Sequence, residues 1–476
     1  MSSADTSAEQ RTRTCYSAGA PLAGGEDPAG ADRAAGDAMR LDQLYEIIDL
    51  KGAGERMHRF ISELYPICRS ITGGGFRQSL GHVGKHIPLV IREVPSGTKV
   101  FDWTVPKEWN IRDAFVKDAQ GTRVIDFKES NLHVVNYSVP VRKRVSLAEL
   151  KEHLHTLPDL PDWIPYRTTY FKEAWGFCLS HRRFLELRDS EYEVCIDASL
   201  EDGYLTYGEY YLEGETADEV LISCHTCHPS LCNDNLSGVA VATFLAKHLS
   251  RLPLQYSYRF LFIPGTIGSI TWLALNEDKV SRIRHGLVVA CVGDPGKFHY
   301  KRSRCGDAEI DRAAVHALRH SEEEFEVLDF SPYGYDERQY CSPGFNLAVG
   351  SLTRTPHGRF PQYHTSADDL DFVRPEALAG SLQLYLSVLR ILDNNARYVN
   401  LNPKCEPQLG KRGLYGTLGG HAHAGRFEMA MLWVLNLSDS NHSLLDISER
   451  AAIPFESVVQ AARTLIEHGL LEECRK

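Results

Sequence analysis

The feature that most constrains this chain is a buried strand followed at once by a loop with two histidines and then a helix. Residues 220–224 read VLISC, an apolar run suited to a buried strand. His225 and His228 follow it, Asp234 lies in a turn-rich loop, and residues 239–249 have the apolar spacing of a helix. In open α/β sheets, ligands bind at the carboxyl ends of strands. Imidazole and carboxylate groups at that edge predict a site for zinc or a related divalent ion.

The same stretch carries three cysteines, which leave a second interpretation open. Cys224, Cys227 and Cys232 could combine with His228 in a structural zinc site. Histidine pairs and Asn-Asp-Asn turns also occur in loops that bind no metal. The succession of strand, loop and helix favours the edge of an enzyme sheet over a zinc knuckle.

Length and charge limit the classes of protein that need to be considered. A chain of 476 residues exceeds one ordinary core and predicts two or three domains. No apolar run is long enough for a transmembrane helix, so no membrane partner is expected. The net charge of −11 argues against nucleic acid as a partner. Twelve cysteines without a secretory signal indicate reduced thiols and a cytoplasmic location.

Composition and periodicity divide the chain into four parts. Residues 1–40 are rich in Ala, Gly, Ser and Asp and are predicted to be a disordered tail. Segments 41–95 and 166–405 alternate strands and helices, which predicts an α/β sandwich with a mixed sheet. Residues 96–165 have short alternating runs between turns and are predicted to be an inserted small β domain. Residues 408–476 form a separate unit.

The main domain contains several well-defined element predictions. After residue 166 its sheet is expected to resume with a strand at 191–200, followed by further strands. Helices are predicted at 239–251, at about 270–276, at 311–319 and at about 375–395, from apolar residues at helical spacing.

The C-terminal unit has the form of a winged helix with little or no wing. An apolar helix, 429–437, precedes two helices joined by a short turn. From Ser440 onward the chain has four basic and six acidic residues, a balance that repels phosphate. We therefore expect packing or a homodimer contact here, and not DNA binding.

Three further loops supply candidate metal ligands or catalytic groups. Asp294 follows a predicted strand, Glu337 lies in a polar loop, and Tyr363 and His364 precede the closing helix. Taken alone, each of these three segments would more often be an ordinary surface loop without a functional role. Together with the first stretch they predict a catalytic metal site.

These segments resemble, in the same order, the co-catalytic zinc aminopeptidases with a phosphorylase/hydrolase-like fold. The chain is more closely similar to aminopeptidase-like proteins of uncertain substrate that carry an inserted small β domain and a C-terminal winged-helix domain. The motifs that carry this resemblance are FDWTVPKEWNIRDAF, HTCHPSLCNDNLSG, FIPGTIGSI, DERQYCSPGFNL and QYHTSADDLDF, within residues 41–476. The resemblance implies a three-layer α/β/α domain with a mixed sheet.

The resemblance also implies roles for particular residues. His225 matches the first metal histidine, Asp234 the metal-bridging aspartate, Asp294 the next aspartate ligand and His364 the last histidine. Tyr363 matches the tyrosine that stabilises the oxyanion. These roles are chemically consistent, because zinc polarises a carbonyl and a phenol can donate to the developing negative oxygen.

Two departures from the family pattern affect the prediction. Cys227 stands where a carboxylate would orient the imidazole, and His228 is an additional ligand or an outer partner. The usual Glu-Glu pair, a general base and a ligand, falls at Gly265 and Thr266. The number of zinc ions, one or two, therefore remains open. Glu337 is our hypothesis for the missing general base.

The leading hypothesis is a zinc-dependent hydrolase that cleaves an amide bond in a peptide or an aminoacyl-type metabolite. Tyr363 and the metal would hold the oxyanion, and Glu337 would protonate the leaving amine. Asp368 or Asp369 could bind a free α-amine of the substrate or cap the helix that follows. A single-zinc cyclase or acyl transferase is the second hypothesis. A non-catalytic scaffold, with the winged helix as its interaction module, is the third.

Overall fold

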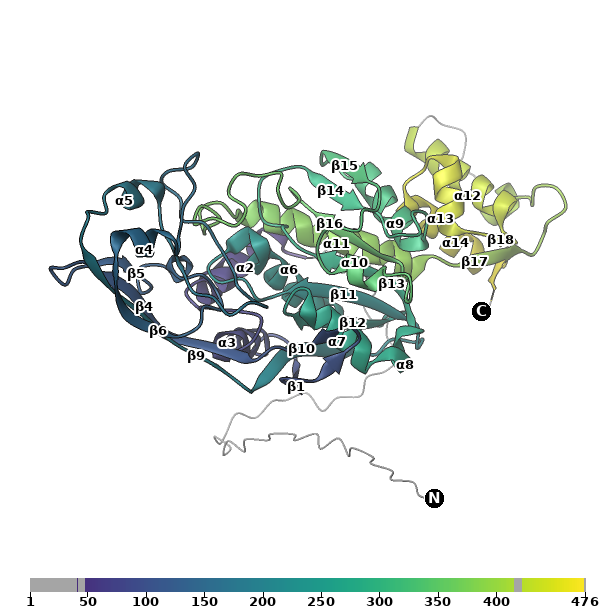
Figure 1. Ribbon diagram of the computed structural model, residues 1–476. Coiled ribbons are helices and arrows are strands. Elements are labelled where there is room, and N and C mark those ends of the chain that lie inside the picture. The colour runs from purple at the N-terminus through teal and green to yellow at the C-terminus, as the bar shows by residue number, and fades with distance from the viewer. Residues whose placement is uncertain (1–40, 42–47, 415–421, 475–476) are drawn as a thin grey trace, which may run out of the picture. The chain divides into compact units, whose positions relative to one another are not determined.

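A computed structural model describes residues 41, 48–414 and 422–474, and an eight-stranded mixed sheet lies at its centre (Figure 1). The strand order is β1-β10-β12-β11-β13-β16-β14-β15. The strands are β1 (Val90–Pro95), β10 (Tyr204–Leu212), β11 (Glu219–His225), β12 (Ser257–Ile263), β13 (Ile283–Val289), β14 (Phe298–Lys301), β15 (Phe325–Leu328) and β16 (Val349–Thr353). The predicted tail, residues 1–40, lies outside the described residues.

The middle of this sheet is parallel, which brings the carboxyl ends of its strands to one edge. β11 pairs in parallel with β12 and β13, and β13 pairs in parallel with β16. All seven residues of β11 are buried, as expected for an apolar strand with neighbours on both sides. In this register His225 lies opposite Ile263, so the residues that follow β11 and β12 meet at the same edge.

Helices cover the sheet and include those predicted from periodicity (Figure 1). α11 (Pro375–Asn394) contacts α2 (Leu50–Leu64), α6 (Gly238–Leu249) and α9 (Glu309–Arg319). Further helices of the main domain are α3 (Gly74–Val83), α7 (Ile267–Leu275), α8 (Glu277–Val280) and α10 (Glu337–Tyr340). The four predicted helices are confirmed, with small shifts at their ends. None of the described helices is both long and apolar enough to cross a membrane.

A second, four-stranded antiparallel sheet has the order β5-β4-β9-β6. Its strands are β4 (Glu108–Lys117), β5 (Arg123–Asp126), β6 (Val141–Ser146) and β9 (Glu191–Glu201). The prediction that segment 191–200 belongs to the main sheet is wrong, because β9 pairs with β4 and β6 along its length. The partly exposed, alternating character of β9 suits an antiparallel sheet better than a parallel centre.

Short elements surround this second sheet. They are β2 (Lys99–Val100), β3 (Trp103–Thr104), η1 (Asn131–His133), α4 (Leu147–Lys151), β7 (Leu154–His155), β8 (Phe177–Cys178) and α5 (His181–Leu185).

The C-terminal unit combines three helices with a small antiparallel sheet. Its elements are β17 (Arg397–Asn400), η3 (Gly410–Arg412), α12 (Ala422–Leu437), β18 (Asp439–Ser443), α13 (Leu444–Ala451), α14 (Phe455–Glu467) and β19 (Leu471–Glu473). β17 is the central strand, so this sheet begins before the predicted boundary at residue 408. The strand was missed because it has only four residues, too few for an alternating pattern to be recognised in the sequence.

Acidic side chains of this unit face the main domain. Arg312 of α9 binds Asp446 at 2.6 Å and Glu449 at 2.5 Å. Arg390 of α11 forms an ion pair with Glu456. Three of the six acidic residues after Ser440 thus pair with the main domain.

Candidate metal centre

Asp234 lies between two imidazoles at the carboxyl edge of the main sheet. Its Oδ1 is 2.8 Å from His225 Nε2, and its Oδ2 is 3.0 Å from His364 Nε2. The ring of His228 lies 5.0 Å from that of His225 and 5.3 Å from that of His364, centroid to centroid. Ligand atoms of His225, His228 and Asp234 lie within 4.8 Å of one another. Three imidazoles and one carboxylate therefore share one small volume.

The backbone around Asp234 is fixed by buried hydrogen bonds. The turn η2 (Cys232–Ser237) carries Asp234 between β11 and α6. Asp368 accepts from the backbone N–H of Asn233 at 2.5 Å and of Asp234 at 2.9 Å. The Asn235 amide donates to the carbonyl of His225 at 3.1 Å. Asp368 therefore holds the Asp234 loop, and both its oxygens are engaged with the backbone.

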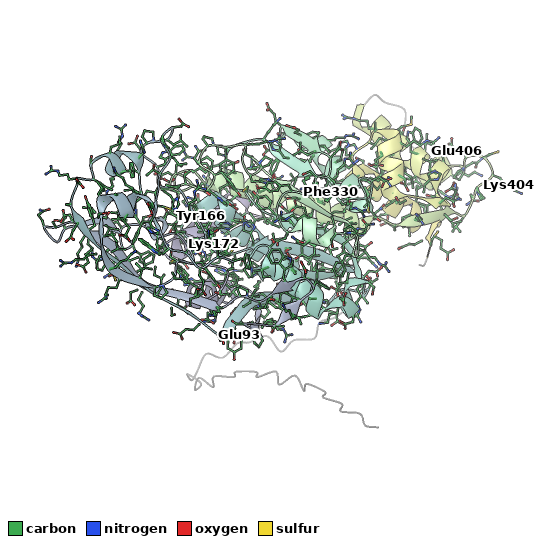
Figure 2. The ribbon with its side chains drawn as sticks, viewed as in Figure 1. Glu93, Tyr166, Lys172, Phe330, Lys404 and Glu406 are labelled. Carbon is green, nitrogen blue, oxygen red and sulfur yellow. The ribbon has the colours of Figure 1, made fainter. Side chains whose placement is uncertain are left out.

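The other two histidines are held by residues from distant parts of the chain. Arg69, which is fully buried, donates from Nε to the His228 carbonyl at 3.0 Å. His364 has a φ of 56°, a region that few residues other than glycine adopt, and its carbonyl accepts from the Tyr166 N–H at 2.8 Å. The Tyr166 ring packs edge-on against both His228 and His364. Tyr166, labelled in Figure 2, is buried.

The electrostatics of this cluster favour metal binding at Asp234 and His228. Burial opposes the charged form of His225, but the hydrogen bond and charge of Asp234 raise its pKa. Burial likewise opposes ionisation of Asp234, yet the surrounding histidines hold its pKa well below the usual value. Burial lowers the pKa of His228 to about 3, which keeps a lone pair free. A metal ion needs an ionised carboxylate and neutral imidazoles. Asp234 and His228 meet this requirement, whereas a bound ion would have to displace the proton that the raised pKa favours on His225.

The donor set fits one zinc ion. Nitrogen from imidazole and oxygen from carboxylate are preferred zinc ligands. His225, His228 and His364 offer imidazole nitrogens, and Asp234 offers carboxylate oxygens. The alternative cysteine site has less support. Cys227 Sγ lies 3.7 Å from His228 Nδ1, but in the described part of the chain no cysteine joins a group of three or more convergent ligands.

Asp294 lies apart from this cluster. Both of its carboxylate oxygens are 3.1 Å from the backbone N–H of Thr355, and burial raises its pKa. The structure thus brings four of the five predicted ligands together and leaves Asp294 outside the group. Whether each of them binds a metal stays a prediction.

The two predicted catalytic residues flank the cluster. The Tyr363 ring stacks on His364 with centroids 4.0 Å apart, and burial raises the pKa of its phenol. Glu337 is 1% exposed, and its Oε1 accepts from Lys301 Nζ at 2.7 Å and from the Tyr335 N–H at 3.2 Å. The Tyr335 ring in turn stacks on His225 at 5.3 Å. Glu337 is thus near the centre but already paired with a cation.

Sequence reasoning missed Asp336, which lies beside the place of the absent Glu-Glu pair. A Cβ on Gly265 would be 3.0 Å from His225 Cβ and 3.3 Å from Asp336 Oδ2. Asp336 Oδ1 accepts from Ser269 Oγ at 2.7 Å, and burial raises the pKa of this carboxyl to about 6. A carboxylate from another loop therefore occupies the space into which a glutamate at 265 would project. The sequence signal was an acidic residue adjacent to Glu337, with nothing to rank the two.

Asp369, the other candidate partner for a substrate amine, has a local structural role. Its Oδ1 accepts from the backbone N–H groups of Asp371 and Phe372, each at 3.0 Å. This is a turn cap ahead of α11.

The chain matches two family models. Residues 58–395 match a domain of unknown function, DUF4910, and residues 396–473 match a winged helix-turn-helix model. A protein of Clostridium acetobutylicum, named as a polysaccharide biosynthesis protein with an aminopeptidase-like domain, is 57% identical over 419 residues. That alignment covers 88% of this chain and 96% of the relative.

Solved structures agree with these matches. A crystal structure of a candidate peptidase from Clostridium acetobutylicum has a TM-score of 0.87 and 54% identity, covering 91% of this chain and 100% of that one. A peptidase M28 precursor from Shewanella amazonensis gives 0.54 at 13% identity, over 74% and 96%. A zinc aminopeptidase from Bacillus subtilis gives 0.52 at 13%, over 71% and 95%.

The comparisons confirm the expected fold, a mixed-sheet α/β aminopeptidase fold with a C-terminal winged helix. They also confirm the resemblance on which that expectation was based. The names of the two Clostridium acetobutylicum relatives support a peptidase-type hydrolase.

Proposed function

For this chain, which belongs to the family that shares the domain of unknown function DUF4910, we propose the function of a single-zinc hydrolase of amide bonds. His225, His228, Asp234 and His364 would hold the ion. The observation that carries this proposal is the Asp234 carboxylate, which contacts one imidazole with each oxygen. The substrate would be a peptide or an aminoacyl compound.

Bound zinc would polarise the substrate carbonyl and lower the pKa of a water molecule. The residues of the chain supply the other parts of the reaction. Tyr363 keeps its proton, because burial raises its pKa, and can donate it as a hydrogen bond to the carbonyl oxygen as negative charge develops. Tyr335 and Tyr166 pack against the imidazoles and limit the access of water.

We assign the role of proton acceptor to Asp336 in preference to Glu337. Glu337 Oε1 is engaged by Lys301, whereas Asp336 Oδ2 lies beside Gly265 and His225. Within the described residues Asp336 Oδ2 has no hydrogen-bond partner. A carboxylate with a free oxygen near the metal centre can take a proton from water and pass it to the leaving amine.

Labelled water provides the test. Metal-free protein is reloaded with one equivalent of zinc and incubated with aminoacyl amides and short peptides in water enriched in oxygen-18. Hydrolysis places one labelled oxygen in the carboxyl product, and a chelator abolishes turnover. Equal rates with and without the chelator would refute metal dependence.

A second candidate activity is cyclisation or acyl transfer at the same centre. The observation that favours it is the presence of Gly265 and Thr266 where the co-catalytic zinc aminopeptidases that the sequence resembles have two glutamates. Such a product carries no solvent oxygen, so the same experiment separates the two reactions. The polysaccharide biosynthesis named for the relative is the biological setting that we propose for either activity.

A further inference from the structure

A cavity of about 310 Å³ adjoins the candidate metal centre. Lys301, Tyr333, Tyr335, Glu337 and His357 are among the residues that line it. Its volume is at the lower end of the range for ligand cavities, roughly 300–1,000 Å³. A group the size of one six-membered ring with its substituents fits such a space, and a long chain does not.

Tyr335 connects the cavity to the metal centre. One side of its ring stacks on His225 at 5.3 Å, and its ring also meets His357 edge-on at 5.0 Å. His357 in turn lies 6.3 Å from Tyr363, centroid to centroid. A group held in the cavity would therefore be one aromatic ring away from the reacting atoms.

The charges of the lining exclude some ligand classes. Lys301 and Arg359 are balanced by Asp329 and Glu337, so the cavity has no net charge from these groups. Burial lowers the pKa of His357 and keeps it neutral. This balance argues against a phosphate or carboxylate ligand.

The Lys301–Glu337 ion pair in the cavity wall requires a glycine at position 334. A Cβ at Gly334 would lie 2.2 Å from Glu337 Oε1 and 2.7 Å from Lys301 Nζ, so a larger residue would displace the pair. Figure 2 marks Phe330, whose ring lies 5.5 Å from Lys301 Nζ. Glu337 Oε2 and Ser351 Oγ are buried and have no partner among the described residues. Buried polar atoms are nearly always paired, so these two are candidates to bind a ligand.

We propose that this cavity takes an uncharged, polyhydroxylated group of the substrate, such as a single pyranose ring. Each hydroxyl both donates and accepts, which matches a wall with ammonium and carboxylate groups side by side. Tyr333, which is 70% exposed, offers an aromatic face at the cavity for the apolar side of such a ring. The link to amide hydrolysis rests on the proposed function, and the substrate would then be an amide of an amino sugar.

Direct binding tests this inference without relying on turnover. Saturation-transfer NMR is recorded on full-length protein, metal-free and zinc-loaded, with N-acetylglucosamine and leucinamide as separate probes and inorganic phosphate as a competitor of the sugar. We expect N-acetylglucosamine to bind in both forms. Glu337→Gln and Lys301→Met should weaken binding by about tenfold or more, since each removes a charged hydrogen-bonding group.

Two other variants keep the test informative. Ser351→Ala removes one hydroxyl and should weaken binding several-fold even if the charge variants fold poorly. Lys297→Met is the matched control, because Lys297 pairs with Glu326 at 3.0 Å and does not line the cavity. Its binding should equal that of the wild type.

The outcomes separate this inference from the proposed function. Displacement of the sugar by phosphate, or unchanged sugar binding in Ser351→Ala and Glu337→Gln, would overturn the inference. Sugar binding by a zinc-loaded protein that hydrolyses no amide would refute just the proposed function. Hydrolysis of leucinamide without sugar binding would refute the inference and leave the proposed function standing.

Discussion

Replacing Asp234 by asparagine should remove most of the zinc affinity, whereas the same change at Asp294 should not. Asp234 contacts His225 at 2.8 Å and His364 at 3.0 Å, one with each oxygen. Asparagine keeps one acceptor and presents an amide N–H₂ to the other imidazole. Asp294 accepts from the backbone N–H of Thr355, and asparagine can keep that hydrogen bond.

The magnitudes follow from these contacts. Losing an outer partner of a metal ligand typically costs 10–100-fold in affinity, so removing a ligand carboxylate should cost at least about 100-fold, or about 2.7 kcal/mol. The metal-free Asp234→Asn protein should also lose about 1.5–3 kcal/mol of stability, because one charged hydrogen bond is lost. Asp294→Asn should lose about 1 kcal/mol at most.

Competition with a chromogenic zinc chelator gives the affinities, and urea unfolding of metal-free protein gives the stabilities. For Asp294→Asn we expect a zinc affinity within about threefold of the wild type. This change is smaller than the roughly 10–100-fold loss that is typical when a residue holding a metal ligand is removed. Two results would refute this reasoning. One is wild-type affinity in Asp234→Asn, and the other is an equal loss of affinity in both variants.

Three further predictions concern other parts of the chain. Asp336→Asn should lower kcat by about 10²–10⁴-fold with zinc content unchanged, and a parallel loss of zinc would make its role structural. Burial lowers the pKa of His316 to about 4, so the unfolded chain takes up a proton near pH 6.5 and the folded chain does not. Stability should therefore fall as the pH drops from 7 to 5, by at most about 2 kcal/mol from this group, and urea titrations of His316→Gln should show a smaller fall. Arg259 binds the buried Glu219 at 2.6 Å and Glu209 at 2.5 Å, so Arg259→Met should lose about 3–5 kcal/mol, and an unchanged melting temperature would argue against this.

The main fold could be predicted because local patterns and global topology agree there. The centre of β11 is mostly apolar, and a strand with parallel neighbours on both sides is buried on both faces. β9 shows the opposite case. Its alternating pattern predicts a strand correctly, but pattern alone does not say which sheet it joins, and its partners β4 and β6 are distant in sequence.

The candidate site could be predicted in part for the same reason. His225, His228 and Asp234 are close in sequence, so one strand–loop–helix motif brings them together. Arg69 and Asp336 could not be found in this way, because they reach the cluster from remote segments through tertiary packing. Asp336 is understood only when the missing side chain of Gly265 is seen to leave space for it.

X-ray absorption at the zinc edge, on protein loaded to saturation, tests the central claim most directly. The account predicts one zinc per chain, surrounded by nitrogen and oxygen at about 2.0–2.2 Å. A shell of sulfur at about 2.3 Å would contradict it and indicate a site built from Cys224, Cys227 or Cys232. A metal neighbour at about 3.5–4 Å would contradict it in another way, because it would show a two-metal centre.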